Sequence, residues 1–237
     1  MTEREHFIRA LRCQPVTGRV PHFELEFFLT MEAFGRIHAS QRQYDQWNQM
    51  SRHEQVLHIQ DNADLHIKVA QRYHHSAIFI HPAPWEDEAI VDLLKAIRDR
   101  TGDEYFIMMH GDPTFEIPRG DNMMEFSAML YEEPEEMHRR ARARLDEHLR
   151  RAEWMAKYPG LLDAFAMCSD YCFNTNPFFS PAIFAEFIAP YLKEGIDAYH
   201  QMGFFAIKHT DGNIMPILEQ IVECGPDALH SLDPQGG

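Results

Sequence analysis

Short apolar segments alternate with longer amphipathic stretches along the 237 residues of the chain. Six of these segments predict β-strands, because each is short and apolar and is bounded by proline, glycine or charged residues. The predicted strands cover residues 19–28, 76–82, 105–110, 161–170, 204–209 and 227–230. Strands that alternate with helices are typical of a parallel sheet. The pattern therefore predicts an α/β fold, built either as an open doubly wound sheet or as a barrel.

Each predicted strand ends in, or is followed by, a side chain that can bind a metal or transfer a proton. In chain order these are Glu24 and Glu26, His81, His110 with Asp112, Asp170, His209 with Asp211, and His230 with Asp233. A (β/α)₈ barrel gathers the carboxyl ends of its strands on the face that carries the active site. An open nucleotide-binding sheet is less well supported, because no glycine-rich phosphate loop follows the first strand. The sequence therefore favours a (β/α)₈ barrel.

The composition is that of one globular domain spanning residues 1–237. A formal net charge of −15 argues against nucleic acid and anionic membranes as partners, since both require a basic surface. No segment reaches the roughly 18 apolar residues of a membrane span, and Thr2 with Glu5 predicts a capping box at the start of an N-terminal helix. Four scattered cysteines do not make a disulfide framework. We therefore expect a cytoplasmic protein.

Three stretches, taken in order, resemble the uroporphyrinogen decarboxylase superfamily. The first runs from Glu3 to Arg12 and is followed by Arg19-Val20-Pro21. The second is Ser169-Asp170-Tyr171, with Ser180-Pro181 at the start of the next helix. The third is Lys208-His209-Thr210-Asp211-Gly212-Asn213, with Gly225-Pro226-Asp227 at the next strand. The resemblance implies a single (β/α)₈ barrel that lacks roughly its last two βα units, with sheet edges through which the chain could form oligomers.

Two features separate the chain from the true decarboxylases of this superfamily. Those enzymes grip the propionates of a porphyrinogen with an arginine-rich loop after the first strand, and they place a catalytic aspartate after the second. Here Glu24 and Glu26 stand in the first position and His81-Pro82 in the second. Carboxylates in a cleft repel a polyanionic substrate. Porphyrinogen decarboxylation is therefore kept as an alternative.

The resemblance is stronger to the corrinoid-dependent methyltransferase branch, which binds zinc through a His-x-Cys pair at the fifth strand. The pair in this chain is His209-Thr210-Asp211. A spacing of two residues places both side chains on one side of a strand end, as joint metal ligation requires. Aspartate in place of cysteine makes the site harder. The resemblance thus implies a zinc-assisted transfer of methyl between a corrinoid protein and a small methylated substrate, for example O-demethylation of a methoxylated compound.

The predicted roles follow from these positions. We expect Asp170, His110 and Asp112 to be catalytic, with Asp170 as proton acceptor or orienting carboxylate. His209 and Asp211 are the predicted metal ligands. The predicted substrate-binding residues are Glu24, Glu26, His81, Asn213 and His230. Cys172 is either a thiolate near the site or a small core residue, and Cys224 is structural. A ligand-binding barrel fragment with no metal and no catalysis is the other alternative.

Overall fold

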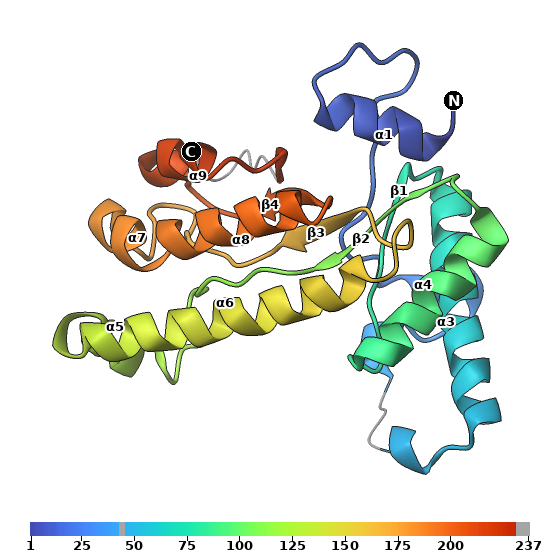
Figure 1. Ribbon diagram of the computed structural model, residues 1–237, viewed down its shortest axis with the longest axis horizontal. Coiled ribbons are helices and arrows are strands. Elements are labelled where there is room, and N and C mark those ends of the chain that lie inside the picture. The colour runs from blue at the N-terminus through green and yellow to red at the C-terminus, as the bar shows by residue number, and fades with distance from the viewer. Residues whose placement is uncertain (43–45, 231–237) are drawn as a thin grey trace. The chain divides into compact units, whose positions relative to one another are not determined.

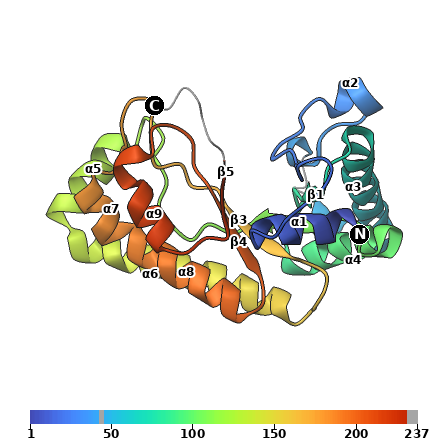
Figure 2. The same ribbon diagram turned by 90° about the horizontal axis from the view of Figure 1, so that it is seen from above.

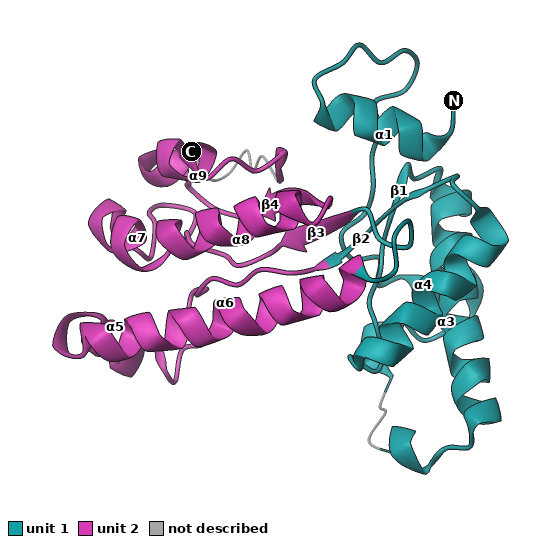
Figure 3. Ribbon diagram, in the orientation of Figure 1, with its two compact units in different colours: residues 1–109, 157–163 teal, residues 110–156, 164–237 magenta. Residues whose placement is uncertain are grey.

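The computed structural model describes residues 1–42 and 46–230, and the chain forms two compact units (Figures 1 and 3). Unit 1 comprises Met1–Met109 and Lys157–Asp163, and unit 2 comprises His110–Ala156 and Ala164–Gly237. Strands and helices alternate in both units, which confirms the predicted α/β class. The interpretation of residues 1–237 as one barrel domain stays a prediction.

Unit 1 contains a pair of parallel strands and the helices that precede and follow them. The elements, in chain order, are α1 (Glu3–Leu11), α2 (Thr30–Phe34), η1 (Ala39–Gln41), η2 (Trp47–Gln49), α3 (Arg52–Tyr73), β1 (Ala77–Phe79), α4 (Asp87–Thr101) and β2 (Phe106–His110). The predicted capping box of Thr2 and Glu5 is present at α1, and a second one, of Ser51 and Glu54, begins α3. Strands β1 and β2 pair with Ala77 opposite Phe106, and α3 packs against α4.

The predicted first strand, residues 19–28, is wrong. This segment has no regular secondary structure, and the side chains of Glu24 and Glu26 are exposed. One backbone hydrogen bond joins it to the residue before β1, from Ser76 N to His22 O at 2.7 Å. Pro21 has no N–H to donate. The alternation of carboxylates with apolar residues is real, but it is not accompanied by a ladder of backbone hydrogen bonds.

Unit 2 contains three parallel strands with the remaining helices. Its elements are α5 (Met123–Glu132), α6 (Pro134–Ala156), β3 (Ala164–Met167), α7 (Pro181–Phe187), α8 (Ala189–Gln201), β4 (Phe205–His209), η3 (Met215–Ile217), α9 (Leu218–Glu223) and β5 (Ala228–His230). Strand β3 pairs with β4, and β4 pairs with β5. Helix α8 packs against α6 and β4 (Figure 2). All four residues of β3 are buried, as the apolar run predicts for a parallel strand.

The helix expected to begin at Ser180-Pro181 is divided in two. Ser180 caps α7, with Pro181 in the first turn as expected. Helix α7 then ends at Phe187, and α8 begins at Ala189 with Pro190 in its first turn. A proline cannot donate the backbone hydrogen bond that a continuous helix requires at that point. Across residues 1–42 and 46–230, no helix is long and apolar enough to cross a membrane.

A buried ion cluster links three elements of unit 1. The carboxylate of Asp163 accepts hydrogen bonds from Arg4 Nε and Nη2 at 2.9 and 2.7 Å, and from Arg98 Nη2 at 2.7 Å. It also accepts one from the backbone N–H of Ile107 at 2.9 Å. The side chain of Asp163 is only 3% exposed. The cluster therefore joins α1, α4 and β2 through one carboxylate.

We expect Asp163→Asn to destabilise the protein by about 3 kcal/mol or more, because removing one partner of a buried ion pair leaves the other charge uncompensated. Urea unfolding at neutral pH measures the effect. Asp99→Asn, at an exposed position of α4, is the matched control and should change the unfolding free energy by no more than about 0.5 kcal/mol. Equal stability of the two variants would contradict the structural role of Asp163.

Candidate metal and active site

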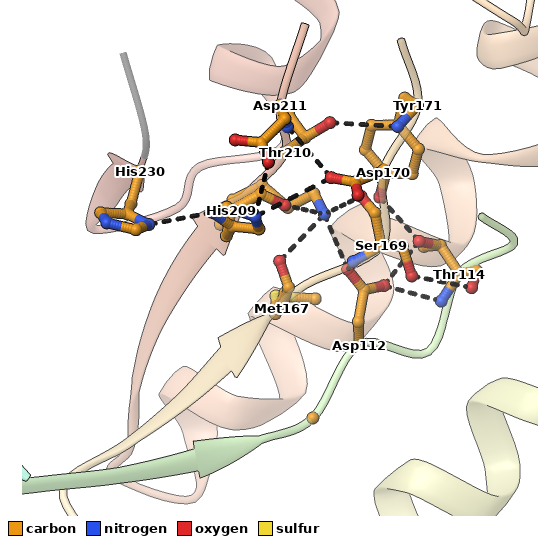
Figure 4. A network of polar contacts seen from close by, with 12 residues as sticks. Asp112, Thr114, Met167, Ser169, Asp170, Tyr171, His209, Thr210, Asp211 and His230 are labelled. Atoms are coloured by element: carbon orange, nitrogen blue, oxygen red, sulfur yellow. Dashed lines mark hydrogen bonds and ion pairs between the residues drawn. The ribbon is translucent and has the colours of Figure 1, made fainter. Parts of the chain in front are cut away.

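Polar residues at the carboxyl ends of two neighbouring strands, β3 and β4, meet in unit 2 (Figure 4). Asp170 follows β3, His209 is the last residue of β4, and Asp211 lies two residues beyond it. His209 Nε2 lies 3.8 Å from Asp170 Oδ1 and 3.8 Å from Asp211 Oδ2. The backbone N–H of Asp211 donates to Asp170 Oδ1 at 3.0 Å. One ligand atom from each of the three residues lies within 4.8 Å of the others.

His230, at the end of β5, orients the imidazole of His209. The two Nδ1 atoms lie 2.9 Å apart, so one of them is the donor and the other the acceptor. Burial lowers the pKa of His209, and the nearby carboxylates of Asp211 and Asp170 only partly oppose this. Burial, together with His209, also lowers the pKa of His230. Both rings are therefore neutral at pH 7. If His209 donates from Nδ1, its Nε2 lone pair faces the two carboxylates, which is the form that binds metals.

A buried lysine lies next to this cluster. Lys208 is fully buried, and its ammonium donates to Asp112 Oδ2 at 2.7 Å. It also donates to the carbonyl oxygens of Met167, Ser169 and His209 at 2.9, 2.8 and 2.7 Å. The ring of Tyr171 lies over it, with its centroid 4.2 Å from Nζ. Lys208 thus connects the loop after β2 with the ends of β3 and β4.

Asp112 is anchored on every side. Its Oδ1 accepts from Thr114 N and Oγ1 at 2.9 and 2.5 Å, and its Oδ2 accepts from Ser169 N at 2.8 Å as well as from Lys208. Burial alone would raise the pKa of Asp112, but the charge of Lys208 and these hydrogen bonds hold it at about 2. A carboxylate that stays ionised and already accepts four hydrogen bonds is a poor proton acceptor. The predicted catalytic role of Asp112 gains no support from these contacts.

His110 and Asn213 have different surroundings. Burial lowers the pKa of His110 to about 4, despite the opposing charge of Asp112, so its ring is neutral at pH 7. The side chain of Asn213 donates to Thr175 O at 3.1 Å and accepts from Met215 N at 3.2 Å. It therefore shapes two loops beside the cluster. Gly212, which precedes it, has φ +83°, and a Cβ there would lie 2.7 Å from the carbonyl oxygen of Cys172.

The surroundings of Cys172 and Cys224 favour a structural role for both side chains. Cys172 is 5% exposed, and burial raises the pKa of its thiol to about 11. Burial also raises the pKa of Cys224 to about 11. Neither side chain is a thiolate at neutral pH, and a metal would have to displace the proton. The thiolate alternative for Cys172 is therefore not supported.

Three of the predicted substrate-binding residues, Glu24, Glu26 and His81, belong to unit 1. Glu24 and His81 line a pocket of that unit, whereas Glu26 is exposed and does not line it. Asp233 lies outside the described residues. The structure thus brings together Asp170, His209, Asp211 and His230 in unit 2. The predicted site residues did not include Lys208, Thr114 or Tyr171. A lysine inside an apolar strand is a signal for such a site, because lysine is almost never fully buried without a partner.

The fold and this cluster define a class: a parallel α/β protein with polar residues at its strand ends, as in a (β/α)₈ barrel. The family model of uroporphyrinogen decarboxylase (URO-D) matches residues 117–235, half of the chain. The chain belongs to the uroporphyrinogen decarboxylase family.

One solved structure, a methyltransferase from Methanosarcina mazei, is similar in fold to the chain, with a TM-score of 0.70 at 16% identity. The match covers 97% of this chain and 75% of that one. No curated protein matches the sequence. These comparisons confirm the predicted superfamily and fold class.

Lys208→Met should destabilise the protein by about 3–5 kcal/mol, because Asp112 would remain buried without its counter-charge. Lys208→Met with Asp112→Asn should be less destabilised than Lys208→Met alone, since no uncompensated charge remains. Urea unfolding of the two single variants and the double variant measures the coupling. Lys193→Met, at an exposed position of α8, is the control and should be near neutral. Strictly additive effects of the two substitutions would contradict the buried pair.

The pair also predicts a pH dependence. The pKa of Asp112 is about 2 in the folded protein, below the value of about 3.9 for an unfolded aspartate. The stability that Asp112 contributes is thus fully present above about pH 5 and is lost as the pH falls through about 4 towards 2. Unfolding free energies measured over this range should fall less steeply for Lys208→Met/Asp112→Asn than for the unsubstituted protein. Parallel profiles would show that Asp112 does not carry this dependence.

Proposed function

We propose that the chain is a metal-assisted methyltransferase, which moves a methyl group between a small methylated substrate and a corrinoid protein. The observation that carries the proposal is the cluster of His209, Asp170 and Asp211, whose ligand atoms lie within 4.8 Å of one another. Membership of the family and the fold likeness to a methyltransferase support it.

The three side chains fit a divalent metal such as Zn²⁺. Ligand atoms about 2.0–2.2 Å from a tetrahedral Zn²⁺ lie roughly 3.4 Å apart. The distances of 3.8 Å from His209 Nε2 to the two carboxylates therefore need only small side-chain movements. Asp170 supplies the third ligand, beyond the predicted pair of His209 and Asp211. One nitrogen and two carboxylate oxygens form a harder donor set than a His-x-Cys pair, which suits a substrate methylated on oxygen or nitrogen.

A metal held there would act as a Lewis acid towards the atom that carries the methyl group. The protein's own groups have separate tasks in this proposal. His230 orients His209, and the backbone N–H of Asp211 fixes Asp170. His110, whose pKa burial lowers to about 4, is uncharged at pH 7, so its ring acts as a polar group that orients the substrate and not as a strong base. Substrate-binding roles for Glu24, Glu26, His81, Asn213 and His230 stay predictions.

Porphyrinogen decarboxylation is the second candidate, because the family whose model matches the chain is named after this reaction. The charge of the site is unfavourable for it. The cluster in unit 2 presents the carboxylates of Asp170 and Asp211, and the ammonium of the adjacent Lys208 is bound to Asp112. Acetate and propionate groups would meet like charge there.

Metal content and methyl transfer together test the proposal. We expect about one equivalent of divalent metal in the purified chain, lost in His209→Ala and strongly reduced in Asp170→Asn. Elemental analysis measures this. We also expect Asp170→Asn to lower methyl transfer by at least about a hundredfold, as loss of a catalytic group usually does. The assay follows formation of methyl-cobalt from a reduced corrinoid protein with methoxylated compounds and methylated amines.

The two measurements separate the roles of Asp170. If Asp170→Asn keeps its metal but loses activity, Asp170 is a proton acceptor and not a ligand. His200→Ala, an exposed histidine paired with Asp227, is the control and should retain both metal and activity. Absence of metal from the unsubstituted protein would overturn the metal-assisted proposal.

A further inference from the structure

Thr210 stands in the chain between two of the proposed metal ligands, His209 and Asp211, but it is not one of the ligands itself. It is only 1% exposed. Burying a hydroxyl group is costly unless the hydroxyl forms hydrogen bonds. The contacts of Thr210 therefore indicate what a polar residue does at this position.

Side chains, and not the regular ladder, join β3 and β4 where the proposed ligands lie. The paired register of the two strands stops one residue before His209. Beyond that point, Thr210 Oγ1 accepts a hydrogen bond from Tyr171 N at 3.0 Å (Figure 4). In the same place, Asp170 Oδ1 accepts one from Asp211 N, also at 3.0 Å. Both bonds run from a backbone N–H to a side-chain oxygen.

These two hydrogen bonds are reciprocal. Asp170 and Tyr171 are neighbours in one segment, and Thr210 and Asp211 are neighbours in the other. Each segment thus gives the other one side-chain acceptor and one backbone donor. We call this pair of bonds the clasp. Sliding of one segment along the other would break both bonds, so the clasp fixes how the ends of β3 and β4 lie relative to each other.

Both sides of the clasp are anchored within unit 2. Tyr171 is fully buried, so its N–H is out of reach of bulk water. Its hydroxyl lies 2.6 Å from Thr114 Oγ1, and its carbonyl oxygen accepts from Phe178 N at 2.9 Å. On the other side, the N–H of Thr210 donates to His230 O at 3.0 Å. Thr210 therefore connects the end of β3 with β5.

We infer that Thr210 is a positioning residue, which holds Asp170 at the distance from His209 and Asp211 that joint metal ligation requires. This role depends on the proposed function, because it concerns the same cluster. The side chain of Asp170 is 47% exposed, so packing alone does not fix it. Its Oδ1 keeps a lone pair for a cation after accepting the N–H of Asp211. Loss of the Thr210 hydroxyl would free the segment that carries this carboxylate.

Thr210→Val tests this role, because valine keeps the branched shape of threonine but has no hydroxyl. Competition titration of the full chain with Zn²⁺ alone should show about tenfold weaker binding, as is usual when a hydrogen bond that orients a metal ligand is lost. Thr210→Ser keeps the hydroxyl and should restore most of the affinity. Affinities for Zn²⁺ that are equal in Thr210→Val and the unsubstituted protein would overturn the positioning role.

Thr30→Val is the matched control. Thr30 is also 1% exposed, and its hydroxyl donates to Arg36 O at 2.8 Å in unit 1. This variant loses a buried hydroxyl with a hydrogen bond, as Thr210→Val does, but it lies outside the cluster. It should bind Zn²⁺ as the unsubstituted protein does. Equal weakening of Zn²⁺ binding in the two valine variants would show a general effect on folding and would also overturn the positioning role.

Amide hydrogen exchange tests the clasp without any metal. In metal-free Thr210→Val, the N–H of Asp211 should exchange about tenfold faster, because its bond to Asp170 has lost its reciprocal partner. The N–H of Gly111, which donates to Ala166 O at 2.9 Å, is the internal control and should be unchanged. Equal acceleration of the two amides, or none, would overturn the clasp. Absence of metal from the unsubstituted protein would instead overturn the proposed function, and the exchange rates would still decide whether Thr210 holds these segments together.

Discussion

The buried ammonium of Lys208 is the constraint on which the functional end of unit 2 depends. A charge removed entirely from water must be compensated by hydrogen bonds and by an opposite charge. The compensating groups here come from three places in the chain: Asp112 after β2, the carbonyls of Met167 and Ser169 at the end of β3, and the carbonyl of His209 on β4. These segments must therefore stay together. The proposed metal site depends on Asp170 and His209. Asp170 directly follows Ser169, whose carbonyl oxygen binds Lys208, and the carbonyl oxygen of His209 itself binds Lys208.

Each unit contains a buried aspartate that fulfils the same physical requirement. Asp163 joins Arg4 and Arg98 to the backbone of Ile107 in unit 1, and Asp112 joins Lys208 to the backbone of Ser169 in unit 2. In both cases, the carboxylate accepts a backbone N–H as well as a charged side chain. Because hydrogen bonds and opposite charges offset the cost of burying a carboxylate, both aspartates can stabilise their unit only while those donors remain. The need to keep these donors in place holds the segments that carry them in a fixed orientation around each aspartate.

Much of the fold could be predicted because its determinants are local. Strands β1 to β5 all lie within predicted apolar segments, and the cap at Ser180 follows from the residues beside it. The segment 19–28 has the alternation of a strand, but whether it joins a ladder depends on a partner that local sequence does not specify. The division between α7 and α8 falls at Pro190, which lacks the N–H that one continuous helix would need there.

The candidate site shows the same limit. His209, Asp170 and Asp211 could be named from motifs and strand ends, and the structure brings them together. The ion pair of Lys208 with Asp112 joins residues 96 positions apart, and the contact of Thr114 with Tyr171 joins residues 57 apart. No local pattern encodes such pairings. A role for Lys208 could only be suspected from the cost of burying a lysine in an apolar strand.

The carboxylates of Asp170 and Asp211 need no metal to compensate their charges. The affinity of the cluster for a metal therefore depends on how its ligands are oriented. The side chains of Asp170 and Asp211 are 47% and 56% exposed, so water solvates their charges. Their mutual repulsion is correspondingly weak at high dielectric. Affinity for a cation must then come from orientation: His230 fixes His209, the N–H of Asp211 fixes Asp170, and Lys208 fixes the backbone that carries them. A solvent-accessible metal held by oriented ligands keeps positions open for a substrate, as catalytic sites do and closed structural sites do not.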